Sequence, residues 1–400
     1  MADEFQKASK LFNKFLKLTL GSYLKYLFGF RVYNDRIAGL KPPYIILANH
    51  TNLWDPFLLS MCIPDPVYFV TSDIHFRNRG LRMLLKLVGA IPKTKFVSDP
   101  QTIKDIFKVA KNGGIIGIFP EGERNWDGST LPLLYPTAKL IKKLGLPVVT
   151  ILFKGSYLSM PRWAKYTRKG ELDMICSRTL EAKDIEAYDA EDIYRLIGKS
   201  LEHNEYEYQR SRMIPYRGKA PAEKLELFLF CCPHCKSIGT MFSRDADFNC
   251  RKCSYSVRYN EFGFFTGNGP QLYFDNPGDW NLWQLKHLQD LKSSGAMEHT
   301  HIPLFEDNDI LMQTGGRLAK MKKLQTGKLS IYPDRIVFQD GGEPAFSFSL
   351  DRIYGENTQL NSQLEFYQDK LLYKFTSDSY PMSSYKWVQA IKIFRQTPES

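Results

Sequence analysis

Residues 44–56 read YIILANHTNLWDP, and this segment alone indicates the architecture of the first half of the chain. Five apolar residues in a row, from Tyr44 to Ala48, are typical of a strand buried on both faces of a parallel sheet. A polar loop follows. Asp55-Pro56 then predicts a helix start, with Asp55 as the N-cap and Pro56 in the first helical position. Strand, polar loop and helix in this order form the repeating unit of an α/β domain.

The same alternation continues along residues 33–215. Apolar runs predict further buried strands at 67–70, 115–119 and 148–153, and helical patterns lie between them at 56–62, 81–88, 101–111 and 136–143. We therefore predict an α/β fold for this region, a mostly parallel sheet with covering helices. In such a fold, the polar loops that follow the strands carry the chemistry.

Length and charge limit the kinds of function. The chain has 400 residues, which favours several domains, and 54 Lys and Arg against 43 Asp and Glu give it a net charge of +11. An excess of positive charge favours anionic partners such as nucleic acid, anionic lipid head groups or phosphorylated ligands. The sequence has no run of about 18 apolar residues and opens with no signal peptide, so we expect an intracellular protein without a conventional transmembrane helix.

The rest of the chain divides by composition. Residues 1–32 are predicted to form an amphipathic, membrane-associating helical segment, and 214–223 have the character of a linker. Beyond the linker we predict a zinc ribbon at 225–262, an aromatic-rich connector at 263–314 and a β-rich domain with a terminal helix at 315–400.

The N-terminal segment has two interpretations. On a helical wheel its apolar face gathers Phe5, Ala8, Phe12, Phe15, Leu16, Leu20, Tyr23, Leu27 and Phe30, and the other side carries Lys7, Lys10, Lys14, Lys17 and Lys25. Either the apolar face packs on the domain behind it, or the helix lies in a membrane interface with its lysines at anionic head groups. We favour the membrane, and hence a peripheral protein on the cytoplasmic side with phospholipids as partners.

His50 and Asp55 are candidates for chemistry because both follow a buried strand. A carboxylate bonded to one imidazole nitrogen fixes the tautomer and lets the other nitrogen take a proton. The alternatives are a loop histidine with ordinary partners and an aspartate that only caps the next helix. This spacing occurs often by chance, so it carries little weight by itself.

A second polar loop follows the predicted strand at 115–119. In this loop Gly122 allows the backbone to approach a ligand closely, and Arg124 offers a planar set of donors suited to phosphate. The alternative is a surface loop in which Arg124 pairs with Glu121 or Glu123.

Taken together, the two loops resemble two motifs of the glycerolphosphate and lysophosphatidate acyltransferase family (the PlsC-like family). The first motif is Asn49-His50-x4-Asp55 and the third is Phe119-Pro120-Glu121-Gly122-x-Arg124. Residues 89–95 (GAIPKTK) resemble the second motif and 146–149 (LPVV) the fourth. The sequence departs from the family pattern at Lys95, where Arg is usual, and at Thr150, where Pro is common.

The resemblance implies an O-acyltransferase of phospholipid synthesis or remodelling that needs no catalytic cofactor. The co-substrate would be acyl-CoA or acyl-carrier protein, and the acceptor a lysophospholipid, by default 1-acyl-sn-glycerol-3-phosphate. By resemblance His50 is the general base and Asp55 orients it. Glu121, Gly122 and Arg124 would hold the acceptor, with Arg124 and Lys95 facing its phosphate. The two departures lie near the predicted acceptor side and leave the acceptor's identity open.

The cysteines indicate a metal site. Cys232-x2-Cys235 and Cys250-x2-Cys253 form two pairs separated by 14 residues, and four thiolates at this spacing can close a tetrahedron on Zn²⁺. Because cysteine fills every position, we predict structural Zn²⁺ rather than a catalytic metal. Unmetallated thiols, a redox pair, and a shift of one ligand to Cys231 or His234 remain alternatives.

The last domain loosely resembles a PH-like or GRAM-like module. A basic approach to its first firm strand, Arg317, Lys320, Lys322, Lys323 and Lys328, indicates either contact with anionic lipid or a solvated run of charge. A protein docking surface is a further alternative for the module.

Two other classes of function compete with an enzyme. A catalytically idle lipid-binding scaffold on the same fold would retain the membrane helix and the C-terminal module, but the intact pair His50 and Asp55 argues against it. A nucleic-acid-binding protein would interleave its lysines with aromatic residues on a sheet. Here the lysines gather on an amphipathic face, so no nucleic acid is expected.

Overall fold

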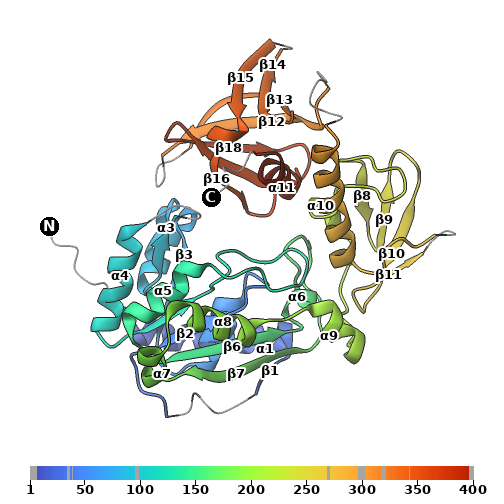
Figure 1. Ribbon diagram of the computed structural model, residues 1–400. Helices are drawn as coiled ribbons and strands as arrows, with labels where there is room; N and C mark the ends of the chain where they lie inside the picture. Colours follow the sequence, from blue (N-terminus) through green and yellow to red (C-terminus); the bar gives the residue numbers. More distant parts are fainter. Residues whose placement is uncertain are drawn as a thin grey trace. The chain divides into compact units, whose positions relative to one another are not determined.

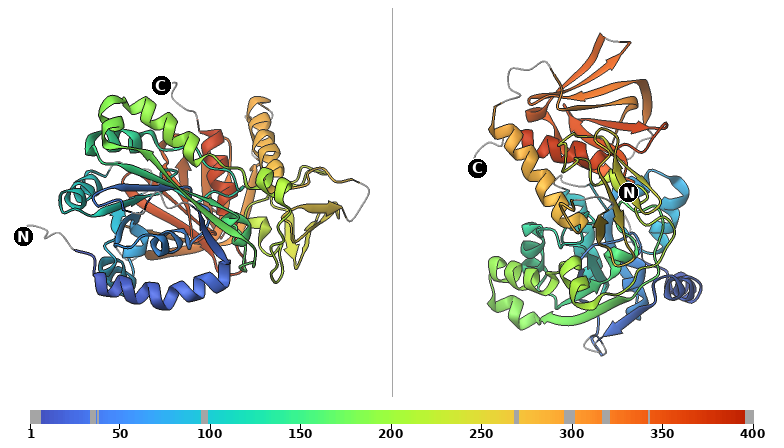
Figure 2. Two further views of the ribbon diagram at one scale, coloured as in Figure 1. Left: turned by 90° about the horizontal axis from the view of Figure 1, so that it is seen from below. Right: turned by 90° about the vertical axis from the view of Figure 1, so that its right-hand side faces the viewer.

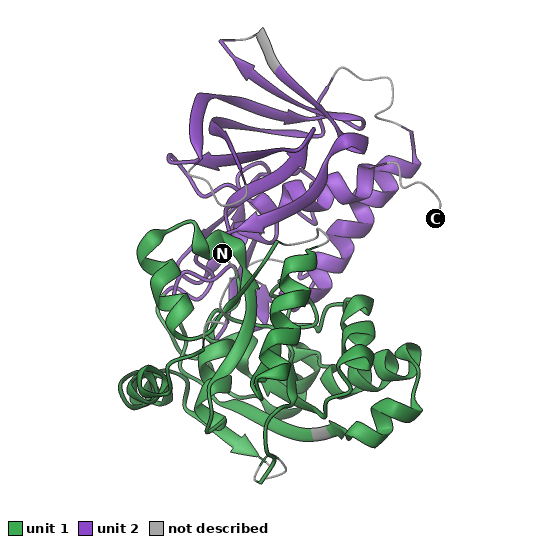
Figure 3. Ribbon diagram, turned by 90° about the vertical axis from the view of Figure 1, so that its left-hand side faces the viewer, with its two compact units in different colours: residues 1–162, 167–219 green, residues 163–166, 220–400 purple. Residues whose placement is uncertain are grey.

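The computed structural model describes residues 7–33, 37, 39–94, 99–267, 271–295, 302–316, 321–341 and 343–395, apart from the side chains of 178 and 343–345. The chain forms two compact units, shown in Figure 3. Unit 1 comprises Met1–Arg162 and Thr167–Lys219, and unit 2 comprises Trp163–Tyr166 and Ala220–Ser400. The last boundary falls inside the linker predicted at 214–223.

Unit 1 is built on one seven-stranded sheet in the order β1-β7-β6-β2-β5-β3-β4. Figure 1 labels β1, β2, β3, β6 and β7 of this sheet. Its strands are β1 (Phe30–Tyr33), β2 (Ile45–Ala48), β3 (Val67–Ser72), β4 (Ile91–Lys93), β5 (Ile115–Ile118), β6 (Val148–Lys154) and β7 (Leu172–Leu180). The strands from β6 to β4 run parallel, β7 is antiparallel to β6, and β1 is parallel to β7. The predicted fold, a mostly parallel sheet with helices, is confirmed.

Helices cover both faces of this sheet because its central strands are apolar on both sides. Ile45 and Leu47 of β2 point into a cluster that includes α4, α5 and α8, whereas Ile46 and Ala48 point into one that includes α1 and α2. All four of these side chains are 0% exposed. The helices of unit 1 are α1 (Lys10–Phe28), α2 (Asp55–Cys62), α3 (Arg79–Leu87), α4 (Pro100–Lys111), α5 (Tyr135–Leu144), α6 (Ser156–Ser159), α7 (Ala182–Ala187), α8 (Ala190–Leu201) and α9 (Glu205–Arg212).

Helix α1 lies on the outside of unit 1, as Figure 2 shows, and has two apolar faces. One face packs on the unit through Leu24 and Phe28, both 0% exposed, while Lys17 donates from Nζ to the carbonyls of Ile63 and Pro64. The other face leaves a run of large side chains in solvent, namely Leu11, Phe15, Leu18, Tyr23 and Tyr26. Among the described residues, none of the helices combines the length and the apolar character needed to cross a bilayer.

Unit 2 begins with a small antiparallel sheet in the order β11-β10-β9-β8. Its strands are β8 (Met241–Arg244), β9 (Asp247–Cys250), β10 (Ser256–Tyr259) and β11 (Phe265–Gly267), and the segment predicted as an aromatic connector contains helix α10 (Pro277–Ser293). Trp280 of α10 is 0% exposed, packs edge-on against Phe248 and Phe265, and donates from Nε1 to the Cys231 carbonyl at 2.9 Å. The aromatic side chains of the connector therefore form a core.

The rest of unit 2 is a second antiparallel sheet of seven strands in the order β15-β14-β13-β12-β18-β17-β16. These strands are β12 (Phe305–Gly315), β13 (Lys322–Ile331), β14 (Arg335–Asp340), β15 (Glu343–Ser349), β16 (Tyr354–Gln359), β17 (Gln363–Gln368) and β18 (Leu371–Ser377), and helix α11 (Ser384–Phe394) follows them. Trp387 and Ile391 of α11 pack into the core of the sheet with Phe366 and Phe375. Arg317 and Lys320 of the basic run lie outside the described residues.

Candidate active site

Three loops meet at the carboxyl edge of the parallel sheet because β2 lies between β6 and β5. Asn49, the first residue after β2, fixes the arrangement: its side chain donates to the Phe153 carbonyl at 3.0 Å and accepts from the Phe153 N–H at 2.7 Å. On the other side, the N–H of Asn125 donates to the carbonyl of His50 at 3.0 Å. The two predicted site loops are therefore neighbours in space.

His50 and Asp55 form a hydrogen-bonded pair. Nδ1 of His50 lies 2.9 Å from Oδ2 of Asp55, whose side chain is 0% exposed, whereas the imidazole is 19% exposed. The ring stacks on Phe119 with 4.1 Å between centroids. With the Nδ1 proton held by the carboxylate, the imidazole lone pair is on Nε2, as a general base requires.

The surroundings of Asp55 correct one expectation. The N-cap of α2 is Trp54, and Asp55 is the first helical residue, so the prediction that Asp55 caps the helix is wrong by one position. Its carboxylate instead accepts from the N–H groups of Thr51 and Asn52 at 2.7 and 2.9 Å, and from Ser156 Oγ at 3.1 Å. These donors hold the carboxylate in place beside the imidazole, which its charge can stabilise when the ring takes a proton.

Glu121 links the site loops to one another. Oε1 accepts from the backbone N–H of His50 at 2.6 Å and Oε2 from that of Leu131 at 2.7 Å, and the residue is 3% exposed. Burial raises the pKa of Glu121 to about 8, although these two backbone donors act in the opposite direction. Both carboxylate oxygens are thus bonded to backbone on either side of the site.

Gly122 forms the turn that follows β5. Its N–H donates to the Phe119 carbonyl at 3.1 Å, and its φ is +77°, a conformation that side chains disfavour. A Cβ at this position would lie 2.8 Å from Cδ1 of Leu134. Only glycine fits this turn without displacing Leu134.

Arg124 lies in the same loop. Burial, together with the positive charge of Arg162, lowers the pKa of Arg124 to about 9, while the charges of Asp55 and Glu123 act in the opposite direction. Apart from Asp55, the sequence predicts five site residues in unit 1. The structure brings four of them together, namely His50, Glu121, Gly122 and Arg124. The fifth, Lys95, lies outside the described residues.

Two residues of the site escaped the sequence analysis. Ser156 Oγ bonds to Asp55 and also accepts from Asn52 Nδ2 at 2.6 Å, and Arg162 forms an ion pair with Glu123 at 2.8 Å. Both follow β6, which is the parallel neighbour of β2. The rule that the loops after parallel strands carry the chemistry applies to β6 as well as to β2 and β5. Applied to β6, it could have pointed to Ser156 and Arg162 from the sequence.

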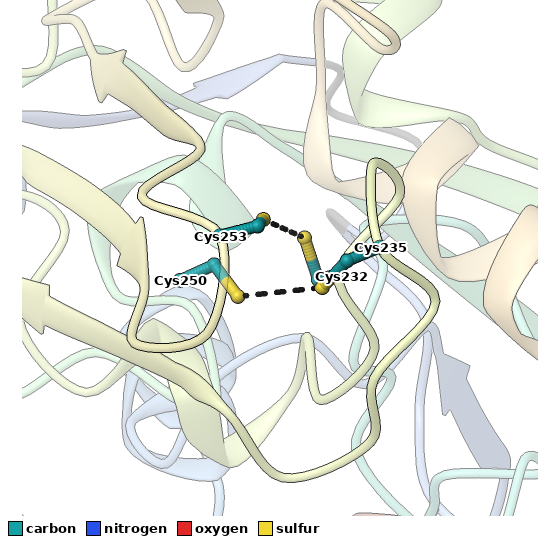
Figure 4. Close-up of side chains that lie close together, drawn as sticks. All are labelled: Cys232, Cys235, Cys250 and Cys253. Atoms are coloured by element: carbon teal, nitrogen blue, oxygen red, sulfur yellow. Dashed lines mark hydrogen bonds between the residues drawn. The ribbon is translucent and has the colours of Figure 1, made fainter.

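The four predicted zinc ligands come together in unit 2 (Figure 4). Their Sγ atoms all lie within 4.8 Å of one another, with Cys232 and Cys253 3.6 Å apart and Cys235 and Cys250 3.7 Å apart. A tetrahedral ZnS₄ centre with Zn–S bonds of about 2.3 Å requires S···S separations of about 3.8 Å, so the donor set fits Zn²⁺. The two alternative ligands have other partners. Cys231 Sγ lies 3.6 Å from the Lys236 carbonyl, and Nδ1 of His234 lies 3.0 Å from the Tyr273 hydroxyl.

Comparison with known proteins agrees with the site. The model of the acyltransferase family matches residues 29–154. A 1-acyl-sn-glycerol-3-phosphate acyltransferase of Bacillus subtilis is 25% identical over 157 residues, which is 39% of this chain and 76% of that protein. A chloroplastic protein of the same name from Brassica napus is 25% identical over 167 residues, 39% of this chain and 46% of that protein.

Among solved structures, the 1-acyl-sn-glycerophosphate acyltransferase PlsC of Thermotoga maritima aligns with a TM-score of 0.40 and 18% identity, covering 48% of this chain and 81% of that one. The matches to these relatives each cover well under half of the chain, and less than half of the Brassica protein is spanned. The family match ends at β6 and contains the pair His50 and Asp55 as well as the Glu121–Arg124 loop. Residues 29–154 therefore carry the match to the acyltransferase family, and the candidate site lies within them.

Proposed function

We propose that this enzyme transfers an acyl chain from a thioester to the free hydroxyl of a lysophospholipid, with 1-acyl-sn-glycerol-3-phosphate as the preferred acceptor. The observation that carries the proposal is the pair His50 and Asp55 beside the loop of Arg124, in which Glu121 accepts a hydrogen bond from the His50 backbone. A general base for a hydroxyl and a cation for a phosphate are thus placed in adjoining loops. The Bacillus and Brassica relatives, both 1-acyl-sn-glycerol-3-phosphate acyltransferases by name, support the same acceptor.

The proposed reaction follows from this geometry. Nε2 of His50 takes the proton of the acceptor hydroxyl as its oxygen attacks the thioester carbonyl. Asp55 stabilises the resulting imidazolium, which then protonates the departing thiolate. Arg124 binds the acceptor phosphate, and the acyl group passes directly from sulfur to oxygen without a covalent enzyme intermediate. We propose acyl-CoA or acyl-carrier protein as the donor.

The test is acceptor-dependent thiol release. Purified protein in liposomes receives acyl-CoA with glycerol 3-phosphate, lysophosphatidate or another lysolipid, and acyl-carrier-protein thioesters form a second donor series. His50→Ala should abolish release while the matched control His287→Ala, in α10 of unit 2, retains it. Release by a folded His50→Ala protein would refute the mechanism. No release from any donor and acceptor pair would favour the lipid-binding scaffold instead.

We also propose that Cys232, Cys235, Cys250 and Cys253 hold one structural Zn²⁺. The support is the closed set of four thiols, which would leave no coordination position for substrate. Metal analysis should give one zinc per chain, and Cys250→Ser should lower that ratio, whereas Cys176→Ser, at a buried cysteine of unit 1, should not. A metal-free protein that keeps its thermal stability would contradict a structural ion. An intramolecular disulfide in the isolated protein would favour the redox alternative.

A peripheral position on the cytoplasmic side of a membrane is the third part of the proposal. Helix α1 supports it, because Leu11 and Leu18 are 80% and 69% exposed and lysines such as Lys14 flank them. Co-sedimentation with phosphatidylglycerol vesicles should be strong for the native protein and lost in Leu18→Glu. Leu282→Glu, at a leucine of α10 that is 64% exposed, is the control. Equal binding by all three proteins would exclude α1 as the membrane contact.

We propose separately that the basic run of the last domain contacts anionic lipid. Lys322 and Lys323 of β13 are exposed, which supports it, whereas Lys328 pairs with Glu306 at 3.3 Å. The test is binding of a Lys322→Glu/Lys323→Glu variant to phosphoinositide-containing vesicles. If the variant binds as the native protein does, the basic run is only solvated charge and does not contact lipid.

A further inference from the structure

Arg162, eight residues beyond the end of the family match in β6, contacts the loop of Arg124. Nη1 of Arg162 lies 2.8 Å from Oε2 of Glu123 and donates to the backbone carbonyl of Arg124 at 2.7 Å. The guanidinium also lies 4.5 Å from the centre of the Trp126 ring. One side chain thus contacts three of four consecutive residues in the site loop.

Burial makes these contacts strong. The Arg162 side chain is 3% exposed and that of Glu123 17%, so water competes little for either charge. Hydrogen bonds to charged groups are the stronger ones in proteins, and a planar guanidinium can bond to a carboxylate, bond to a carbonyl and stack on a ring at the same time. Lysine cannot reproduce this combination.

The segment that carries Arg162 is itself tied to the sheet. Helix α6 follows β6 directly. The N–H of Arg168 donates to the carbonyl of Ser159 at 2.8 Å, and this hydrogen bond closes the loop that runs from Ser159 to Arg168. At the start of α6, Ser156 bonds to Asp55. The position of Arg162 is therefore fixed relative to the same strand ends that fix His50.

We propose that Arg162 is a positioning residue for the acceptor-phosphate site: it anchors Glu123 and the Arg124 backbone so that the Arg124 side chain faces the phosphate. The proposal rests on the function proposed above. Arg162 is too deeply buried to be a ligand of the phosphate, so its effect on the acceptor passes through the loop. The charge of Arg162 lowers the pKa of Arg124, but it also adds positive potential that favours a phosphate monoester at this loop.

The test separates acceptor binding from chemistry. Arg162→Met should raise the KM for lysophosphatidate by about 10- to 100-fold, which corresponds to the loss of hydrogen bonds to charged groups. The KM for the acyl donor and kcat at saturating acceptor should change by less than about threefold. Arg162→Lys should recover only part of the loss. Arg195→Met, at an arginine whose side chain is 75% exposed on α8, is the matched control and should behave as the native protein.

A double-mutant cycle keeps the proposal testable if Arg162→Met folds poorly. Glu123→Gln removes the ion pair from the other side, and its effect on acceptor KM should not add to that of Arg162→Lys, because both weaken one interaction. An unchanged acceptor KM in folded variants would overturn the proposal, as would an equal rise for donor and acceptor. Native protein that transfers no acyl group to any acceptor would instead refute the proposed function.

Discussion

Replacing Asp55 by asparagine tests the role of its charge with little change of shape. Oδ2 accepts from His50 Nδ1, Thr51 N–H and Asn52 N–H at 2.7–2.9 Å, so the amide oxygen of the new side chain would take this position. The amide nitrogen would then face Ser156 Oγ, which lies 3.1 Å from Oδ1 and can rotate to accept. The fold should therefore tolerate the change, and the imidazole should keep its orientation.

The expected loss follows from the missing charge. Opposite charges about 4 Å apart interact by about 4 kcal/mol at an effective dielectric constant of about 20. If the Asp55 charge stabilises the imidazolium by this amount in the transition state, kcat should fall by about 1,000-fold, since about 1.4 kcal/mol corresponds to a factor of ten. The KM for the acceptor should change little, because Asp55 does not face the phosphate in the proposed mechanism.

The assay is steady-state thiol release at saturating donor and acceptor, with circular dichroism to show that the variant is folded. Asp192→Asn, at an aspartate whose side chain is 38% exposed on α8, is the control for the same chemical change. A folded Asp55→Asn protein with kcat within about tenfold of the native value would refute the reasoning. Asp55 would then be a structural residue that only shapes the loop.

Three further predictions concern stability. Gly122→Ala should lower the free energy of unfolding by about 1–3 kcal/mol, because it places a Cβ 2.8 Å from Leu134 at a φ of +77°, and chemical denaturation would measure this. Burial raises the pKa of Glu121 from 4.5 to about 8, so folding takes up a proton between these values. The free energy of unfolding should consequently fall as pH rises through this window, by up to about 1.4 kcal/mol per pH unit, and Glu121→Gln should flatten the profile; an identical profile in both proteins would contradict it. Asp307→Asn should destabilise unit 2 by about 3–5 kcal/mol, because it leaves Lys386, whose side chain is 3% exposed and lies 3.1 Å from Asp307, without its counter-charge. Calorimetry would detect the change, and an unaltered transition would show that the ion pair does not stabilise unit 2.

The central strands could be predicted from sequence because burial on both faces leaves uninterrupted apolar runs. β2, β3, β5 and β6 all begin within one residue of their predicted positions. The strands that were missed lack such runs. β7 carries Asp173 within it, edge strand β1 is largely exposed, and the first half of β12 is mostly polar, with buried side chains at alternating positions such as Ile310 and Met312.

The site could be predicted as far as it lies in short motifs. His50 and Asp55 are five residues apart, and one hydrogen bond joins them, so local spacing already implies their contact. Arg162 and Glu123 are 39 residues apart, and neither belongs to a periodic pattern. Their contact depends on how the segments after β5 and β6 meet, which no local pattern encodes.

The passage of residues 163–166 through unit 2 bears on how this protein can be divided. Trp163 is 1% exposed and packs edge-on against Tyr259, with 5.7 Å between ring centroids, and Lys165 pairs with Glu223 at 3.2 Å. A fragment ending at Lys219 would contain every strand of the acyltransferase sheet, yet it would present this indole to solvent. The fragment would thus lose the contacts that bury this side chain in the full chain. Anyone who isolates the acyltransferase half for crystallography or screening should therefore replace Trp163 with a polar residue. The boundary between the two halves in sequence, at Lys219, does not coincide with the boundary in side-chain packing, because residues 163–166 pack in unit 2.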